Sequence, residues 1–324
     1  MKKKSHPYTA TNIANIIAIC GPTRSGKVIV SKIVSSMKNF EKINVDFLWE
    51  QFVQLSFLGK ISKVNAIYLL RRGISLLTYN LLIGREINFK KGDFSSIYSY
   101  QSPNTYLHRS KYAKEGDNVF KKIKKKKMNI PIMIHWGTNA SDLLFETFSK
   151  IKMIRMIKNP FEIAYSWLQR DYGGKFYSNP RTSSLTLKYK NRILPYFAHG
   201  WENVYLRSNK YDRVGIMITK YIRKEMKVYN SLNSNYKKRI LSIKFDELIQ
   251  YPKKNIKLIE KFLNTKQTKF TKKILKQEKI PRNLLKKELN NKKNFLKKKL
   301  SPNVYSNLLK IEKKYLKLNK NLSA

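Results

Sequence analysis

The stretch that decides the fold is Gly21–Val28, which reads Gly-Pro-Thr-Arg-Ser-Gly-Lys-Val. It follows an apolar run, Ile13–Cys20, and precedes a segment, Val30–Met37, in which apolar residues recur at helical spacing. A strand, a tight loop and a helix start, in that order, aim backbone N–H groups and the positive end of the helix at one small volume. Arg24 and Lys27 add two full positive charges there. The loop therefore predicts a binding site for phosphate or sulfate.

Further strands and helices alternate after the loop. Short buried strands are expected at Ile130–His135, Ile151–Ile157 and Arg239–Phe245. Helices are expected over residues 141–149, over residues 160–168 and from Pro252 onward. Strands separated by helices predict an α/β fold with a parallel sheet that helices cover on both faces. In such sheets the functional site lies beyond the carboxyl ends of the strands.

The composition divides the chain into regions. We predict an α/β domain over residues 1–263, in which the aromatic-rich segment 46–128 forms helices and long loops over the sheet. The aromatic side chains of this segment either form ordinary core or line an acceptor pocket. Residues 264–324 are rich in lysine and contain no glycine, and we expect a helical C-terminal extension with one helix beginning at Ser301-Pro302.

The chain is strongly basic, with 68 Lys and Arg residues against 20 Asp and Glu residues and a formal net charge of +48. This balance is typical of proteins that bind nucleic acid. Lysine, asparagine and isoleucine are all abundant, however, as AT-rich codon usage would make them in any protein, and the lysines are spread over the whole chain. We therefore expect no specific nucleic-acid partner, but a field that attracts small polyanions.

Cysteine and histidine usage limits the class of protein. A single cysteine, Cys20, excludes an intrachain disulfide, and four scattered histidines predict no metal site. The most apolar segment, residues 61–83, contains Arg71 and Arg72, so we expect buried or amphipathic helices there and no membrane span. No targeting segment stands out, and we expect a cytoplasmic protein.

The anion loop fits two kinds of nucleotide site. As a Walker A loop it has the spacing G-x-x-x-x-G-K, but Val28 stands where a Ser or Thr hydroxyl would hold Mg²⁺. The loop also resembles the 5′-phosphosulfate loop of the sulfotransferases, because Arg24-Ser25-Gly26 stands where that family has Lys/Arg-Ser-Gly-Thr-Thr. The sulfotransferase reaction requires no metal.

A second motif, Lys158–Ser166, reads Lys-Asn-Pro-Phe-Glu-Ile-Ala-Tyr-Ser at a strand-to-helix junction. A cation at the end of a strand and a hydroxyl two turns into the next helix can bracket one phosphate. The motif resembles the sulfotransferase pattern in which Arg-Asn-Pro is followed by a Ser eight residues after the Arg. Arg239–Leu248 with Tyr251-Pro252, and Leu300–Pro302 with its helix, are similar to further segments of that family. The chain thus resembles the sulfotransferases that use 3′-phosphoadenosine-5′-phosphosulfate (PAPS).

The resemblance implies a P-loop-like sulfotransferase fold, and transfer of a sulfuryl group from PAPS to a hydroxyl or amine of a carbohydrate, lipid or small molecule. It implies that Arg24 stabilises the leaving group and that Lys158 and Ser166 bind the 3′-phosphate. Lys158 replaces the family's Arg and lacks its bidentate fork. The residues implied to bind the 5′-phosphate are Arg24, Ser25, Gly26, Lys27 and Val28, of which Lys27 and Val28 replace the family's Thr-Thr.

The resemblance also suggests two candidates for the base that takes the acceptor proton. In the cytosolic branch a His ends the strand before the Arg-Asn-Pro strand, and His135 stands 23 residues before Lys158. In the carbohydrate-modifying branch a Glu on the helix after the second strand has this role, and Glu50 stands near that position. Either side chain can accept a proton if burial tunes its pKa.

Two other functions are compatible with the sequence. One is a P-loop kinase or NTPase, which would bind ATP with Mg²⁺, whereas the sulfotransferase interpretation predicts a preference for adenosine 3′,5′-bisphosphate. The other is a catalytically inactive relative that retains the nucleotide site. Segment 46–128 contains no pattern that identifies the acceptor.

Overall fold

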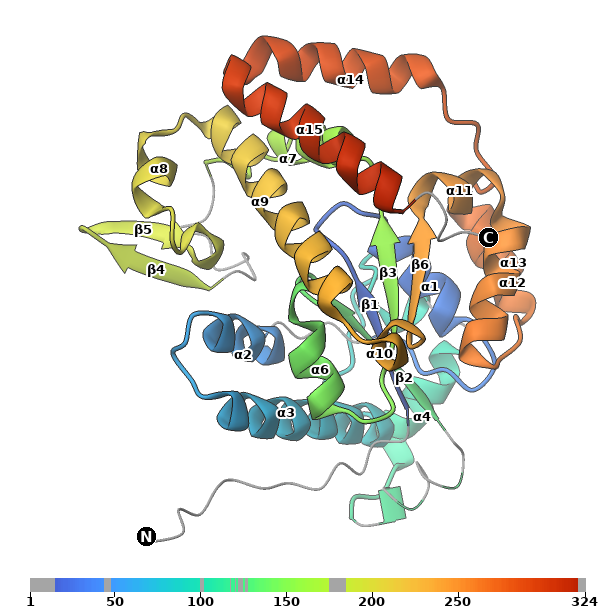
Figure 1. Ribbon diagram of the computed structural model, residues 1–324. Helices are drawn as coiled ribbons and strands as arrows, with labels where there is room; N and C mark the ends of the chain where they lie inside the picture. The colour runs from blue at the N-terminus through green and yellow to red at the C-terminus, as the bar shows by residue number, and fades with distance from the viewer. Residues whose placement is uncertain are drawn as a thin grey trace, which may run out of the picture.

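The computed structural model describes residues 15–43, 48–99, 102–116, 128–174 and 185–319, together with positions 118, 119, 121 and 125. Its centre is a parallel sheet of four strands in the order β2–β1–β3–β6 (Figure 1). The strands are β1 (Asn15–Cys20), β2 (Asn129–Ile134), β3 (Lys152–Ile157) and β6 (Ile240–Lys244). The predicted α/β class and parallel sheet are confirmed. The last strand ends earlier than expected, because Phe245 begins helix α11 (Phe245–Gln250).

The strand order places a topological switch between β1 and β3. The chain passes from β1 to β2 on one side and then returns to β3 on the other side of β1. In open parallel sheets, ligands bind beyond the carboxyl ends of the strands at such a switch. The Gly21–Val28 loop follows β1 and the Lys158–Ser166 motif follows β3, so both predicted anion-binding segments meet there.

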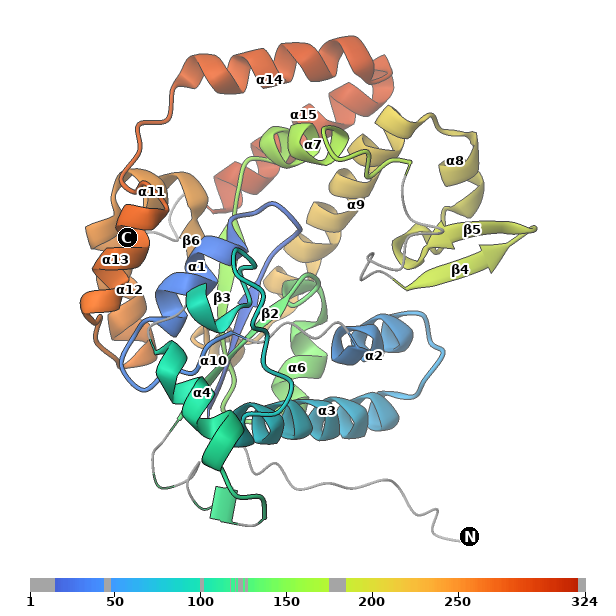
Figure 2. The same cartoon turned by 180° about the vertical axis from the view of Figure 1, so that it is seen from behind.

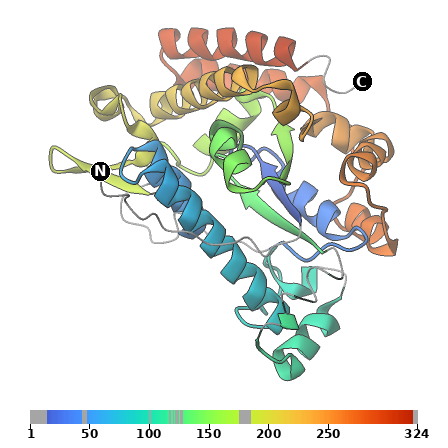
Figure 3. The ribbon, with the colours of Figure 1, turned by 60° about the horizontal axis from the view of Figure 1, so that its bottom comes forward.

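Helices cover both faces of the sheet because the side chains of β1 alternate between them. Ile16, Ala18 and Cys20 pack with α2, α3 and α6, whereas Ile17 and Ile19 pack with α1, α12 and α13. In Figure 3 the long helix α3 lies on the opposite side from α12 and α13. The bounds are α1 Lys27–Ser35, α2 Leu48–Phe57, α3 Lys63–Ile83, α6 Ser141–Thr147, α12 Pro252–Leu263 and α13 Lys269–Gln277.

A third apolar cluster joins α7, α9, α14 and α15 beside the sheet, where Figures 1 and 2 show α14 and α15 side by side. The helix expected from Ser301-Pro302 is confirmed as α15, and its buried Leu308 and Ile311 belong to this cluster. The bounds of these helices are α7 Pro160–Leu168, α9 Lys210–Ser231, α14 Lys286–Lys299 and α15 Pro302–Leu318. The shorter helices are α4 Pro103–Tyr112, α8 Glu202–Arg207 and α10 Ser234–Lys237, and 3-10 turns cover Ile97–Ser99, Thr138–Ala140 and Tyr196–Ala198.

A fully buried arginine ties two of these helices to the sheet. Arg155 on β3 is 0% exposed and forms an ion pair with Glu225 of α9, which is also 0% exposed. Its Nη1 donates to Oδ1 of Asn319, next to the end of α15, at 2.9 Å. A buried ion pair needs such additional hydrogen bonds to offset the loss of water. The central strand, α9 and the end of α15 therefore form one packed unit.

A two-stranded hairpin that the sequence analysis did not predict lies apart from the sheet. It consists of β4 (Thr186–Tyr189) and β5 (Arg192–Pro195), paired antiparallel. Its two turn residues, Lys190 and Asn191, have φ of 45° and 59°, as a two-residue hairpin turn requires. Among the described helices, none has both the length and the apolar composition that a membrane span needs.

Candidate functional site

The loop after β1 is held open as a cradle by its backbone. Gly21 and Gly26 have φ of 144° and 97°, in the region that favours glycine. A Cβ on Gly26 would lie 2.3 Å from Cδ2 of Phe245, so no side chain fits there. The amide of Ser25 donates to the Pro22 carbonyl at 3.2 Å, which closes the turn. The chain then enters α1 directly, and the first amides of that helix have no partner within it.

Arg24 is held in a left-handed conformation with φ of 72°, which is uncommon for a residue with a side chain. The indole Nε1 of Trp167 on α7 donates to the carbonyl of the preceding residue, Thr23, at 2.9 Å. This bond fixes the loop against α7. The Arg24 Nε in turn donates to Oγ of Ser166 on the same helix at 3.1 Å. The structure thus brings together two residues that were predicted from motifs 142 positions apart.

Positive charge accumulates around this contact. Nη1 of Arg170 lies 3.5 Å from the Ser166 hydroxyl, and no carboxylate within the described residues forms an ion pair with Arg24. Burial, and then repulsion from Arg170, lower the pKa of the Arg24 guanidinium. Two cationic donors that meet at one hydroxyl favour an anionic ligand beside them.

Lys158 lies at the end of β3, next to the anion loop. Its Nζ is 4.1 Å from the centre of the Phe245 ring, the same ring that packs against Gly26. Burial lowers the pKa of Lys158, although Glu162 and Asp246 act in the opposite direction, and the charge of Arg24 lowers it further. Repulsion from Lys292 and from Arg24 therefore adds to the effect of burial at Lys158.

Lys27 has an orientation that the sequence analysis did not predict. Its side chain is buried, and its Nζ donates to the carbonyl oxygen of Gly21 and, at 3.0 Å, to that of Pro22. The ammonium thus braces the inside of the loop instead of extending toward a ligand. Burial lowers the pKa of Lys27 to about 7, while the nearby Glu50 carboxylate raises it.

The low pKa of Lys27 predicts a pH-dependent stability. The folded protein loses this proton near pH 7, whereas the unfolded chain keeps it until about pH 10.5, so raising the pH within this window favours the folded state. Relative to Lys27→Met, the free energy of unfolding of the wild type should rise by about 2 kcal/mol between about pH 7 and pH 9. Urea denaturation at several pH values measures this difference, with the exposed Lys253→Met as control. If the free energies of unfolding of the wild type and of Lys27→Met changed with pH in parallel, the low pKa of Lys27 would be contradicted.

The loop also contains a buried hydroxyl that suits an anion. Oγ of Ser25 is fully buried and has no hydrogen-bond partner among the described residues. Buried polar atoms are nearly always paired, so one without a partner needs an explanation. A phosphate oxygen in the cradle would accept from this hydroxyl and from the first amides of α1. Ser25, Gly26 and Val28 can therefore offer donors to an anion in the cradle, and the exposed Arg24 stands beside them.

Glu50 and His135, predicted as alternative bases, form one pair. Glu50 on α2 is 2% exposed, and its Oε2 lies 2.9 Å from Nδ1 of His135, just after β2. Its Oε1 accepts the backbone amides of His135 at 2.6 Å and of Trp136 at 3.3 Å. The hydroxyl of Tyr221 on α9 donates to the His135 carbonyl at 2.8 Å. The backbone and ring of His135 are thus held from two sides.

The charge of Glu50 determines which nitrogen of His135 is basic. Burial acts to raise the pKa of the Glu50 carboxyl, but His135 and Lys27 outweigh it and the pKa is lowered. An ionised carboxylate only accepts hydrogen bonds, so Nδ1 of His135 carries the hydrogen. In the neutral ring Nε2 then has the lone pair, the arrangement that a carboxylate imposes on a histidine base.

Sequence reasoning missed three residues that build this site: Trp167, Phe245 and Tyr221. Each contacts a residue more than 80 positions away, so no local pattern marks it. Within the described part of the chain, no three His, Cys, Asp or Glu side chains gather as metal ligands would.

Comparison with known families gives one match, which spans most of the chain. Residues 15–317 match the family model of the sulfotransferase domain. No curated protein matches the chain.

Several solved structures have distant similarity. A sulfotransferase from Mycobacterium avium is 10% identical over 95% of this chain and 77% of its own, with a TM-score of 0.46. The sulfotransferase domain of the olefin synthase from Synechococcus PCC 7002 is 11% identical over 83% of this chain and 80% of its own, with a TM-score of 0.44. A sulfotransferase from Alicyclobacillus acidocaldarius is 12% identical over 86% and 90%, with a TM-score of 0.37.

Proposed function

The chain belongs to the sulfotransferase family, as its motifs predict, and we propose that it transfers a sulfuryl group from PAPS to a hydroxyl or amine of an acceptor. The observation that carries the choice of donor is the contact between Arg24 and Ser166. It joins the loop suited to a 5′-phosphate to the helix suited to a 3′-phosphate. A doubly phosphorylated adenosine matches two adjacent clusters of positive charge.

In the proposed reaction the chain positions two reactants and neutralises charge. The acceptor oxygen or nitrogen forms a bond to sulfur while the bond from sulfur to the bridging oxygen of the donor breaks. Arg24 stabilises the charge that develops on the departing phosphate, and the amides of Gly26 and Val28 hold that phosphate. Lys158 and Ser166 hold the 3′-phosphate. Lys27 acts indirectly, through the loop carbonyls that it braces.

The acceptor proton goes to Nε2 of His135. Glu50 does not compete for this role, because its carboxylate already accepts hydrogen bonds from the amides of His135 and Trp136 and faces Nδ1. Glu50 orients the imidazole and stabilises the imidazolium that forms. His135 therefore acts as the base, and Glu50 orients it in the same step of the reaction.

Thermal denaturation with nucleotides tests the donor. We expect adenosine 3′,5′-bisphosphate to raise the melting temperature without Mg²⁺, because ligand binding to the folded state stabilises it by mass action. ATP should have a smaller effect that added Mg²⁺ does not increase, since Val28 offers no hydroxyl to the metal. Stabilisation by ATP–Mg²⁺ alone would favour the kinase or NTPase alternative. Stabilisation by the bisphosphate without transfer to any acceptor would identify an inactive relative.

A further inference from the structure

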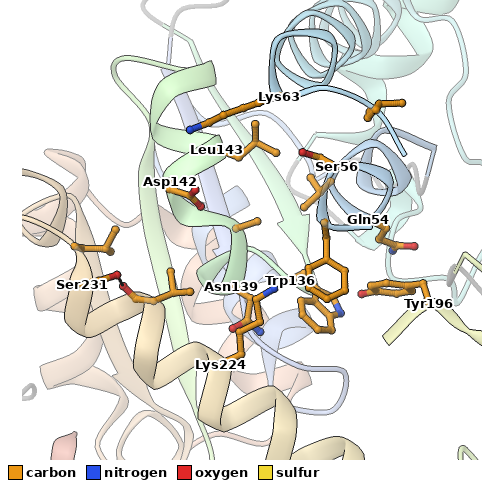
Figure 4. Close-up of a pocket in the computed structure, with 16 residues that line it drawn as sticks. Gln54, Ser56, Lys63, Trp136, Asn139, Asp142, Leu143, Tyr196, Lys224 and Ser231 are labelled. Atoms are coloured by element: carbon orange, nitrogen blue, oxygen red, sulfur yellow. Dashed lines mark hydrogen bonds between the residues drawn. The ribbon is translucent and has the colours of Figure 1, made fainter. Parts of the chain in front are cut away.

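A pocket of about 460 Å³ lies beside the Glu50–His135 pair, on the side of the sheet that α2 and α6 cover. Figure 4 shows its walls, which come from α2, the turn and helix after β2, the turn at Tyr196 and α9. The residues that decide its chemistry are Phe57, Trp136, Asn139, Tyr196 and Lys224.

The residues that line the pocket include neither Glu50 nor His135, but helix α2 and Trp136 connect the pocket to that pair. Glu50, Val53 and Phe57 are spaced by three and four residues, so they share a helix face. Phe57 lines the pocket about 10 Å along the helix axis from Glu50, which holds His135. Trp136 lines the pocket too, and it directly follows His135 in the chain. The pocket therefore adjoins the residue that follows the proposed base in the chain.

Two buried polar side chains face this pocket without a partner. Asn139 is 5% exposed, and neither its Nδ2 nor its Oδ1 has a hydrogen-bond partner within the described residues. The same holds for the hydroxyl of Tyr196, which is 2% exposed. Leaving such groups unpaired is costly, so their presence in a pocket indicates a ligand that pairs with them. An amide that offers both a donor and an acceptor suits a hydroxyl, which is also both.

The charged side chains that line the pocket are Lys63, Asp142 and Lys224, of which Lys63 forms an ion pair with Glu146. The Nζ of Lys224 lies 3.6 Å from the centre of the Phe57 ring and 5.4 Å from that of Trp136, and it forms no ion pair with any described residue. Burial lowers the pKa of Lys224 to about 8, although Asp142 acts to raise it. A partly desolvated ammonium gains more from an anionic partner than an exposed one does.

The aromatic side chains give the pocket a flat, rigid wall. The ring of Trp136 packs against Phe57 at 5.5 Å and against Tyr196 at 5.3 Å, measured between ring centres. Such a wall suits the face of a ring compound rather than a flexible chain. Cation, amide and aromatic wall therefore converge on one small volume.

We propose, building on the sulfuryl transfer inferred above, that this pocket binds the acceptor and that the acceptor is a hydroxylated ring carrying a carboxylate. Lys224 binds the carboxylate, Asn139 and Tyr196 bind ring hydroxyls, and the aromatic wall binds the face of the ring. The hydroxyl that receives the sulfuryl group projects toward His135. Sugar acids and aromatic hydroxy acids both have this chemistry.

Direct binding without donor tests the proposal with two matched pairs of probes. Methyl β-glucuronide is compared with methyl β-glucoside, and 4-hydroxybenzoate with 4-hydroxybenzamide, by calorimetry. In at least one pair the acid should bind about tenfold more tightly than the neutral compound, because it gains a charge-assisted bond to Lys224. A preference within the first pair identifies a sugar acid as the acceptor type, and one within the second identifies an aromatic hydroxy acid.

Lys224→Met should abolish the preference and leave the affinity for adenosine 3′,5′-bisphosphate unchanged. Lys224→Arg should retain the preference, and so should Lys227→Met, which removes an exposed lysine from the same helix. Equal affinities within both pairs, or a preference that survives in Lys224→Met, would overturn the inference. Intact, Lys224-dependent binding without transfer from PAPS would instead count against the proposed function.

Discussion

Arg24→Ala should reduce the turnover number for sulfuryl transfer by about a hundredfold to a thousandfold, the range found when a single charge-stabilising donor is removed. The reason is that Arg24 stands at the rim of the loop with its guanidinium unpaired by any described carboxylate, where it can meet charge on the departing phosphate. Affinity for adenosine 3′,5′-bisphosphate should fall less than turnover, because the loop amides and Lys158 remain. Steady-state kinetics and calorimetry measure the two effects.

The matched control for this prediction is Arg207→Ala, which removes one exposed arginine from α8. It should leave turnover unchanged, and both variants should melt within a few degrees of the wild type. Arg24→Lys should recover part of the lost activity, because lysine restores the positive charge but cannot form the bidentate hydrogen bonds of arginine. Near-normal turnover in folded Arg24→Ala would refute the role given to the loop.

His135→Gln should lower turnover by about a hundredfold to ten-thousandfold, the contribution typical of a positioned general base. Glu50→Gln should also lower it, because the ring loses the carboxylate that fixes Nδ1–H and stabilises the imidazolium. The double variant should be scarcely slower than His135→Gln alone, since the two residues act in one step. Kinetics of the two single variants and the double variant measure this coupling.

The affinity for adenosine 3′,5′-bisphosphate tests whether the Glu50 and His135 variants leave the donor site intact. Affinity for adenosine 3′,5′-bisphosphate should be unchanged in His135→Gln, because this side chain makes no contact with the anion loop. Glu50→Gln also removes a carboxylate that raises the pKa of Lys27 in the loop, so its affinity for the bisphosphate is measured separately. His108→Gln on α4, which lies away from the loop in Figure 1, controls for loss of a histidine. Additive losses from His135→Gln and Glu50→Gln would mean that the residues act separately.

Local sequence patterns were sufficient for the sheet and for the anion-binding segments. Each strand is a short apolar run, and the loop and the Lys158 motif each lie at a strand end, so parallel pairing brings them to one edge. The two loop glycines with positive φ, Gly21 and Gly26, could be read directly from the sequence. The positions of these segments at the strand ends depend on local residues, which is why their positions could be predicted.

Long-range contacts explain what could not be predicted. The sequence offered Glu50 and His135 as alternatives because nothing local indicates that residues 85 positions apart meet. The pocket is assembled from α2, α3, α6, α9 and two 3-10 turns, which are far apart in the sequence, so no local pattern marks it. We expected Lys27 to contact a phosphate. A side chain at the first position of a helix points back toward the N-terminus of that helix, however, and the Nζ of Lys27 donates there to the loop carbonyls.

The buried contacts of Arg155 have a consequence for folding during translation. Its partner Asn319 is made 164 residues later, so the nascent polypeptide lacks this hydrogen bond until the end of α15 has been synthesised. The N-terminus of a chain leaves the ribosome first, and N-terminal domains begin to fold during translation. The contact that ties β3 to the end of α15 therefore forms only after Asn319 has been made, and we expect nascent chains that end before Asn319 to be more prone to aggregation than chains that include it.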